Sequence, residues 1–184
     1  HTWTMTDLRR DDEHWSPVTA GSARNHLSQL LLSCLAYFRD KPLLCSETET
    51  VEEYTTRFLA QEEHYGWTLD YEPQIFCTLA HEGFITTSCE FLTDEDSAPP
   101  IQLLLPWIAP ERHCLDFQHV RVSRQVRRCA KHYTMTTDQA FDEVMLGCVQ
   151  QHGEDWLFRG LRWLLRQIFY HTSEASGHSS SVDS

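Results

Sequence analysis

The residues best suited to chemistry in this chain are five cations that lie within fourteen positions. Five of the fifteen Lys and Arg fall between His119 and His132, a stretch without Asp or Glu. They are Arg121, Arg124, Arg127, Arg128 and Lys131. In a helix that begins after Ser123, the last four are spaced i, i+3, i+4 and i+7 and share one face. Like charges on one face repel each other and are stabilised when phosphates neutralise them, which indicates a polyanion partner. The alternative is an ordinary solvated surface.

Short motifs follow one another in a fixed order on both sides of these cations. Upstream, an Asp and a Pro are followed after nine further residues by Gly-Phe-Ile, at Asp70, Pro73 and Gly83 to Ile85. Next come P-I-x(4)-P at Pro100 to Pro106, R-x-x-L at Arg112 to Leu115, and V-S-R at Val122 to Arg124. The series closes with Y-x-x-T-x-x-x-A-F-x-x-V-x-x-G-C at Tyr133 to Cys148, and W-L at Trp156 and Leu157. In order and spacing, residues 66 to 157 resemble the leucyl/phenylalanyl-tRNA–protein transferases.

The resemblance implies an enzyme that passes Leu or Phe from a charged tRNA to the N-terminus of an acceptor protein, which marks that protein for degradation. It implies no metal and no organic cofactor, since the donor is already an activated ester. The cationic helix would hold the tRNA acceptor stem, and Trp156 would line the pocket for the aminoacyl-adenosine end. Phe84, Leu103 and Leu104 would form an apolar pocket for the transferred side chain. For all four residues core packing is the alternative. No residue is assigned as general base.

Departures from the family pattern leave two functional hypotheses open. Thr86 and Thr87 stand where the family has Pro-Trp, and Leu103 and Leu104 replace a Trp-Trp pair. After Leu157 there is no counterpart of the family's H-S-V/I-E-x-W or G-E-S-M-F-S segments. The chain therefore resembles the front half of such an aminoacyltransferase, or a diverged and shortened relative. The alternative is a non-catalytic remnant that binds tRNA, or that binds a basic protein through its acidic helix over residues 50–63.

Composition narrows the class of protein. With 184 residues and 41% hydrophobic residues, the chain is long enough for one domain with a real core. A net charge of −12 argues against nonspecific affinity for nucleic acid. None of the seven cysteines forms C-x-x-C, which argues against a disulfide scaffold or a zinc ribbon. The apolar runs are too short to span a bilayer, and no leader is visible. We expect a cytoplasmic protein without metal or membrane partners.

The elements that must position these residues are expected to form an α+β fold. A helical N-terminal region (1–65) would come first. A truncated transferase-like domain (66–171) would follow, with a partial acetyltransferase-like (GNAT-type) mixed sheet and flanking helices. The chain would end in a disordered Ser-rich tail (172–184). Periodicity predicts helices over 23–38, 50–63, 72–81, 123–131, 137–148 and 155–170. Strands are expected over 101–106 and 114–117, paired as a hairpin, and over 133–136. Residues 1–20 are expected to be poorly ordered, with Trp3 and Trp15 as anchors. Gly83 would end the third helix.

Overall fold

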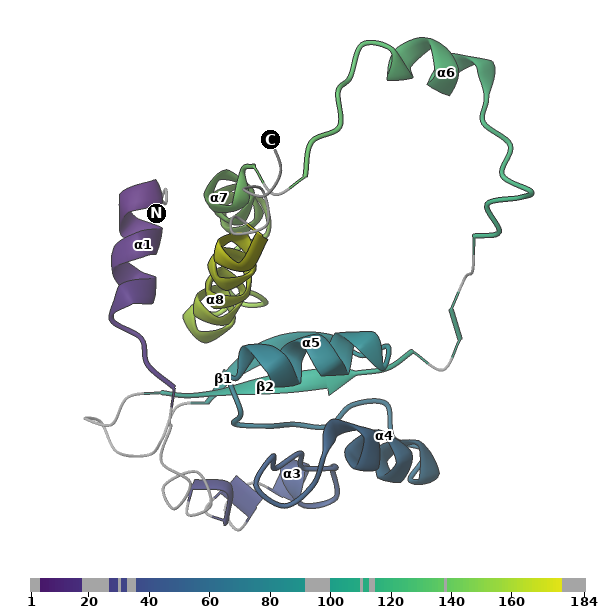
Figure 1. Cartoon of the computed structure of the whole chain (residues 1–184). Coiled ribbons are helices and arrows are strands. Elements are labelled where there is room, and N and C mark those ends of the chain that lie inside the picture. Colours follow the sequence, from purple (N-terminus) through teal and green to yellow (C-terminus); the bar gives the residue numbers. More distant parts are fainter. Residues whose placement is uncertain are drawn as a thin grey trace, which may run out of the picture.

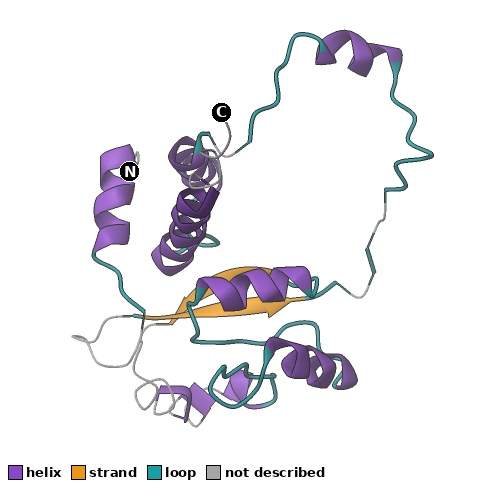
Figure 2. Ribbon diagram, viewed as in Figure 1, coloured by secondary structure: helices purple, strands orange, loops and turns teal. Residues whose placement is uncertain are grey.

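A computed structural model describes residues 4–17, 27–29, 31–32, 36–91, 100–109, 111–112, 115–137 and 139–176. These residues form helices and a small antiparallel sheet, an α+β arrangement (Figure 2). The helices are α1 (Met5–Glu13), α3 (Ala36–Arg39), α4 (Val51–Ala60), α5 (Pro73–His81), α6 (Arg124–Ala130), α7 (Phe141–His152) and α8 (Arg159–Ser176). The strands are β1 (Ile85–Phe91) and β2 (Ile101–Trp107).

The sheet pairs β1 with β2 in a register that runs from Ile85 opposite Trp107 to Phe91 opposite Ile101. The other edge of β2 is bridged by Thr68, whose N–H donates to the Leu104 carbonyl at 2.9 Å and whose carbonyl accepts from Leu104 N–H at 3.0 Å. The predicted hairpin between residues 101–106 and 114–117 is therefore wrong. Of this predicted strand, residues 115–117 are described, and they are not in a strand: the carboxylate of Asp116 accepts from the N–H of Gln118, and the chain turns there.

The sheet separates the hydrophobic cores of the molecule. Figure 1 shows α1, α7 and α8 on one side of the sheet and α3 and α4 on the other. Neighbouring strand residues point to opposite faces, so Leu104 joins a cluster with α7 and α8 while Leu103 joins one with Phe38 and Trp67. A third cluster holds α4 against α5 through Tyr54, Phe58, Leu79 and other residues.

The helices predicted over 50–63 and 72–81 are confirmed, because both carry local start signals. Thr50 and Glu53 form a reciprocal capping box: the Thr50 hydroxyl accepts from Glu53 N–H at 3.2 Å, and the Glu53 carboxylate accepts from Thr50 N–H at 2.8 Å. Pro73 occupies the first turn of α5. Gly83 follows this helix with φ +96°, a conformation that favours glycine.

The prediction of a poorly ordered N-terminus is wrong for residues 5–13, which form α1. Its buried Asp12 accepts a hydrogen bond at 2.9 Å from the buried guanidinium of Arg162 in α8. Arg166 of α8 lies 3.2 Å from Asp12 and 3.1 Å from the buried carboxylate of Asp142 in α7. Arg9 of α1 also pairs with Asp142. These charges tie α1 to both C-terminal helices, although 150 positions separate Asp12 from Arg162.

Trp15 follows α1 and anchors this end of the chain, as the sequence predicts. Its ring lies 4.7 Å from the ring of Tyr71 and 5.2 Å from that of Trp163. Trp3, the other predicted anchor, lies outside the described residues.

Several predicted boundaries in the second half of the chain are corrected. The helix over 123–131 is confirmed as α6, but residues 133–136 form no strand. The helix expected from 137 begins at Phe141, and the one expected from 155 begins at Arg159. That last helix continues to Ser176, past the predicted start of the tail at 172, and residues 177–184 lie outside the described part. Of the helix over 23–38, residues 27–29, 31–32 and 36–38 are described, and all are helical.

Candidate nucleic-acid interface

The predicted cations lie on a segment that leaves the body of the protein. We call residues 115–137 the arm. Every residue of the arm is exposed. Among the described residues, the hydrogen bonds and ion pairs of the arm are all made within it. Figure 1 shows the arm as a long excursion between β2 and α7 that holds α6 away from the sheet.

Local capping, and not tertiary packing, forms α6. Ser123 has an extended conformation (ψ 156°), and its hydroxyl accepts from the N–H of Val126 at 3.2 Å. At the other end, Tyr133 N–H donates to the Ala130 carbonyl at 3.1 Å. Arg127 and Arg128 fall in the last turn, where the helix dipole favours positive charge. The helix has seven residues and buries none of them, so its stability on its own is marginal.

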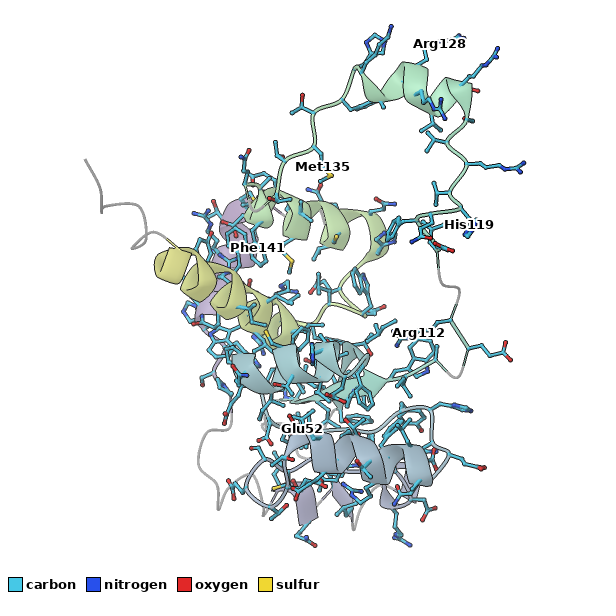
Figure 3. The ribbon with its side chains drawn as sticks, turned by 45° about the vertical axis from the view of Figure 1, so that its right-hand side comes forward. Glu52, Arg112, His119, Arg128, Met135 and Phe141 are labelled. Carbon is cyan, nitrogen blue, oxygen red and sulfur yellow. The ribbon has the colours of Figure 1, made fainter. Side chains whose placement is uncertain are left out.

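The structure places four predicted tRNA-binding residues on one exposed face. Arg124, Arg127 and Arg128 lie within α6, and Lys131 is its C-cap. Arg121 lies in the extended segment just before the helix. None of these five cations forms an ion pair with another described residue. Figure 3 shows the side chain of Arg128 on α6, far from the rest of the molecule.

The arm also contains one acid and exposed aromatic side chains. The ring of His119 bonds to the Asp116 carboxylate, and this bond holds the pKa of Asp116 below its usual range. Phe117, in the same turn, is 85% exposed, and Tyr133 beyond α6 is 79% exposed. An exposed ring beside a row of cations is the combination that proteins use to bind single-stranded nucleic acid.

Trp156, the sixth predicted tRNA-binding residue, lies at the surface between α7 and α8. Its indole is 41% exposed and meets the ring of His152 edge-on, with centroids 6.0 Å apart. Leu157 and Leu161 enter the core cluster of α7 and α8, and the indole does not. The indole is therefore accessible to a ligand, although no described contact joins it to the arm.

The three residues predicted to line an aminoacyl pocket are not brought together. Phe84, Leu103 and Leu104 are all buried. Each belongs to a different hydrophobic cluster: Phe84 packs with α4 and α5, Leu103 with Phe38 and Trp67, and Leu104 with α7 and α8. The structure thus gives all three a packing role.

Sequence reasoning missed the buried polar residues that connect distant elements. Besides Asp12, Asp142 and Arg162, these include Gln102 of β2, whose side-chain oxygen accepts from the N–H of Gly160 at 2.8 Å. A local signal was the spacing of Arg162 and Arg166, which places both on one face of a helix among apolar residues such as Leu161, Leu164 and Leu165.

Two further searches of the described residues found nothing. No group of three or more His, Cys, Asp or Glu side chains is arranged to hold a metal ion there. Among those same residues, no helix combines the length and the apolar character needed to cross a bilayer.

The chain was compared with models of protein families, with curated proteins and with solved structures. None of the three comparisons found a match.

Proposed function

We propose that this chain binds aminoacyl-tRNA and transfers Leu or Phe from it to the N-terminus of an acceptor protein. The observation that supports this function best is the cationic face of α6, which is fully exposed and has no acidic partner among the described residues. The transfer reaction itself is inferred from the ordered motifs, which resemble those of the leucyl/phenylalanyl-tRNA–protein transferases. The acetyltransferase-like fold and the cytoplasmic location belong to the same proposal; the described residues show an α+β arrangement with a two-stranded antiparallel sheet (Figure 2).

Phosphate binding would stabilise α6 as well as the complex. The three arginines of α6 and Lys131 at its C-cap repel one another, and each phosphate that approaches them removes part of this repulsion and releases counterions. Since the helix buries none of its residues and bonds only within the arm among the described residues, part of the binding energy orders it. Trp156 would stack on the terminal adenine, which contributes roughly 1–3 kcal/mol.

The proposed reaction is a direct aminolysis. The acceptor's α-amino nitrogen attacks the ester carbonyl, a tetrahedral intermediate forms, and the 3′ hydroxyl of the tRNA leaves with a proton. The donor ester is already activated, so no ATP is consumed. The role of this chain's residues is to hold the tRNA so that the ester and the amine meet in line.

A second candidate is binding of tRNA without transfer. One observation favours it: Phe84, Leu103 and Leu104 pack in three separate clusters and leave no shared pocket for the transferred side chain. A protein of this kind would bind charged and uncharged tRNA equally, because it would not contact the amino acid.

The test combines transfer and binding. Radiolabelled Leu-tRNA and a protein with N-terminal Arg or Lys are incubated with the chain without ATP, and label in the protein is counted. In parallel, tRNA affinity is measured for the unmodified chain, for Arg127→Glu/Arg128→Glu, and for Arg39→Glu as an exposed control.

Each result has a distinct meaning. We expect the double reversal to weaken tRNA binding at least about a hundredfold at low salt, and the control to leave it unchanged. Label in the acceptor protein establishes the transferase. Intact tRNA binding without label establishes the second candidate, and equal affinity of the double reversal would overturn both.

A further inference from the structure

The charge of this chain is divided between two parts. The arm has five Lys and Arg and one Asp, a formal charge of +4. The whole chain carries −12, so the other residues carry −16. Opposite charges attract over about 10 Å at moderate ionic strength, and less as salt rises. A molecule that holds a cationic arm away from an anionic body is complementary to a second copy of itself.

The acidic counterpart of α6 is the outer face of α4 and the turn that follows it. Glu52 and Glu53 lie exposed in the first turn of α4, and Glu62 is exposed just beyond its end. Leu59 lies between these acids and is 56% exposed. The opposite face of the helix is buried through Tyr54 and Phe58, so α4 presents a fixed acidic surface.

The two surfaces match in length and in chemistry. The ten residues of α4 extend about 15 Å, with Glu52 at the start of the helix and Glu62 just after its end, and the cations of α6 cover about 10 Å. Arginine side chains are long enough to span this difference. Their aliphatic stems can cover Leu59 while their guanidinium groups reach the glutamates on either side.

A molecule's own arm is poorly placed to use its own α4. Figures 1 and 3 show α4 and α6 at opposite ends of the molecule, and in Figure 3 the labels of Glu52 and Arg128 mark these two ends. Two copies related by a twofold axis satisfy both surfaces of both molecules, because each arm then meets the partner's α4.

We propose that two copies of this chain form a reciprocal dimer in which the cationic face of α6 of each copy binds the acidic face of α4 of the other. This dimer follows from the two charged surfaces and does not rest on the proposed tRNA binding or transfer. It covers the same cations that would bind tRNA, so dimerisation and tRNA binding compete.

The test is sedimentation velocity on the full chain at 50 and 500 mM NaCl, with no nucleic acid present. We expect a species of twice the 21.5 kDa chain mass at low salt, with a dissociation constant at least about tenfold weaker at high salt. Two variants separate the surfaces: Arg127→Glu/Arg128→Glu in the arm and Glu52→Lys/Glu62→Lys on α4. Each is expected to be monomeric alone. Glu13→Lys/Glu143→Lys makes the same change in net charge as the α4 variant, at other exposed sites, and should dimerise normally.

Mixing the two monomeric variants is the decisive step. In the mixture both contacts again join opposite charges, one natural and one reversed, so a heterodimer should form. All changed residues are exposed, and far-UV circular dichroism checks that each variant is folded. A chain that is monomeric at both salt concentrations overturns the proposal. So does a dimer that the reversals leave intact, or a mixture that stays monomeric.

Discussion

At the residue scale, the packing of the N-terminal helix depends on Asp12. Its carboxylate is buried and accepts from the guanidinium groups of Arg162 and Arg166. Arg162 is itself buried, and it also donates to the Leu157 carbonyl at 3.0 Å. A buried ion pair contributes little compared with apolar residues of the same size, but removal of one partner leaves an uncompensated charge in the interior.

We therefore expect Asp12→Asn to lower the free energy of unfolding by about 3–5 kcal/mol. Asparagine keeps the shape and removes the charge, so the loss reports on the charge of Arg162. Urea denaturation followed by circular dichroism measures it. Glu13→Gln removes a neighbouring but exposed charge and should change stability by less than about 0.5 kcal/mol. Equal effects of the two substitutions would contradict this account.

The rate at which each cysteine thiol is alkylated reports how far that residue is buried. Burial in the sheet raises the pKa of Cys89 to about 12, from an ordinary value of 9.0. Only the thiolate is alkylated, so its fraction at pH 8 falls roughly a thousandfold. We expect iodoacetamide to modify the exposed Cys77 and Cys129 well before Cys89, as read by peptide mass spectrometry. Early modification of Cys89 in the folded protein would show that β1 is open to solvent.

At the scale of elements, backbone N–H groups at the start of α8 and just before it form hydrogen bonds to side chains of the sheet. Phe158 N–H donates to the Ser88 hydroxyl at 3.3 Å, and Gly160 N–H donates to the Gln102 side chain at 2.8 Å. Gln102 in turn donates to the Glu90 carboxylate at 2.7 Å. The strands thus supply the hydrogen-bond partners that the first turn of a helix lacks.

Glycine makes this close approach possible. A β-carbon at Gly160 would lie 2.6 Å from the Gln102 side-chain oxygen and 2.8 Å from the ring of Trp15. We expect Gly160→Ala to destabilise the fold by about 1–3 kcal/mol, because α8 would have to move off the sheet. Gly147→Ala is the matched control, since nothing lies within 4 Å of a β-carbon there. In the middle of α7 it should stabilise by about 0.5–1 kcal/mol, and thermal unfolding of both variants shows the difference.

Elements with local signals could be predicted from the sequence, and those that depend on distant partners could not. Thr50, Pro73 and Ser123 each mark a helix start that the structure has. The sequence predicts residues 114–117 as the partner of β2, whereas the structure pairs β2 with β1, because strand pairing depends on packing against other elements. For the site, the cationic face of α6 follows from spacing alone. The separation of Leu103 from Leu104 follows from the strand predicted over 101–106, because neighbouring strand residues point to opposite faces. The cluster that each joins depends on the elements that pack on the two faces of the sheet, which the sequence does not give.

At the scale of the whole molecule, the arm and the body are held in different ways. The chain before the arm and the chain after it share one core, in which Leu104 packs with Leu157 and Leu161. The pair of Asp12 and Arg162 joins the same two parts. The arm adds no buried residue to this core.

Limited trypsin digestion should therefore cut first within the arm, at the cations between Arg121 and Lys131. We expect the two fragments to stay together in size-exclusion chromatography and to keep the circular dichroism of the intact chain. Arg57, which is held by Glu49 and by the Leu43 carbonyl, should resist cleavage under the same conditions. Fragments that separate at once would show that the body depends on the intact connection.

The pairing of α1 with α8 also sets the order of events as the chain is made. Asp12 leaves the ribosome 150 residues before Arg162, the buried guanidinium that donates to its carboxylate in the folded protein. Closing so long a loop costs entropy that only the finished contact repays. Although α1 is synthesised well before α8, it docks only after the segment of α8 that carries Arg162 has emerged, and until then the nascent chain keeps it in water.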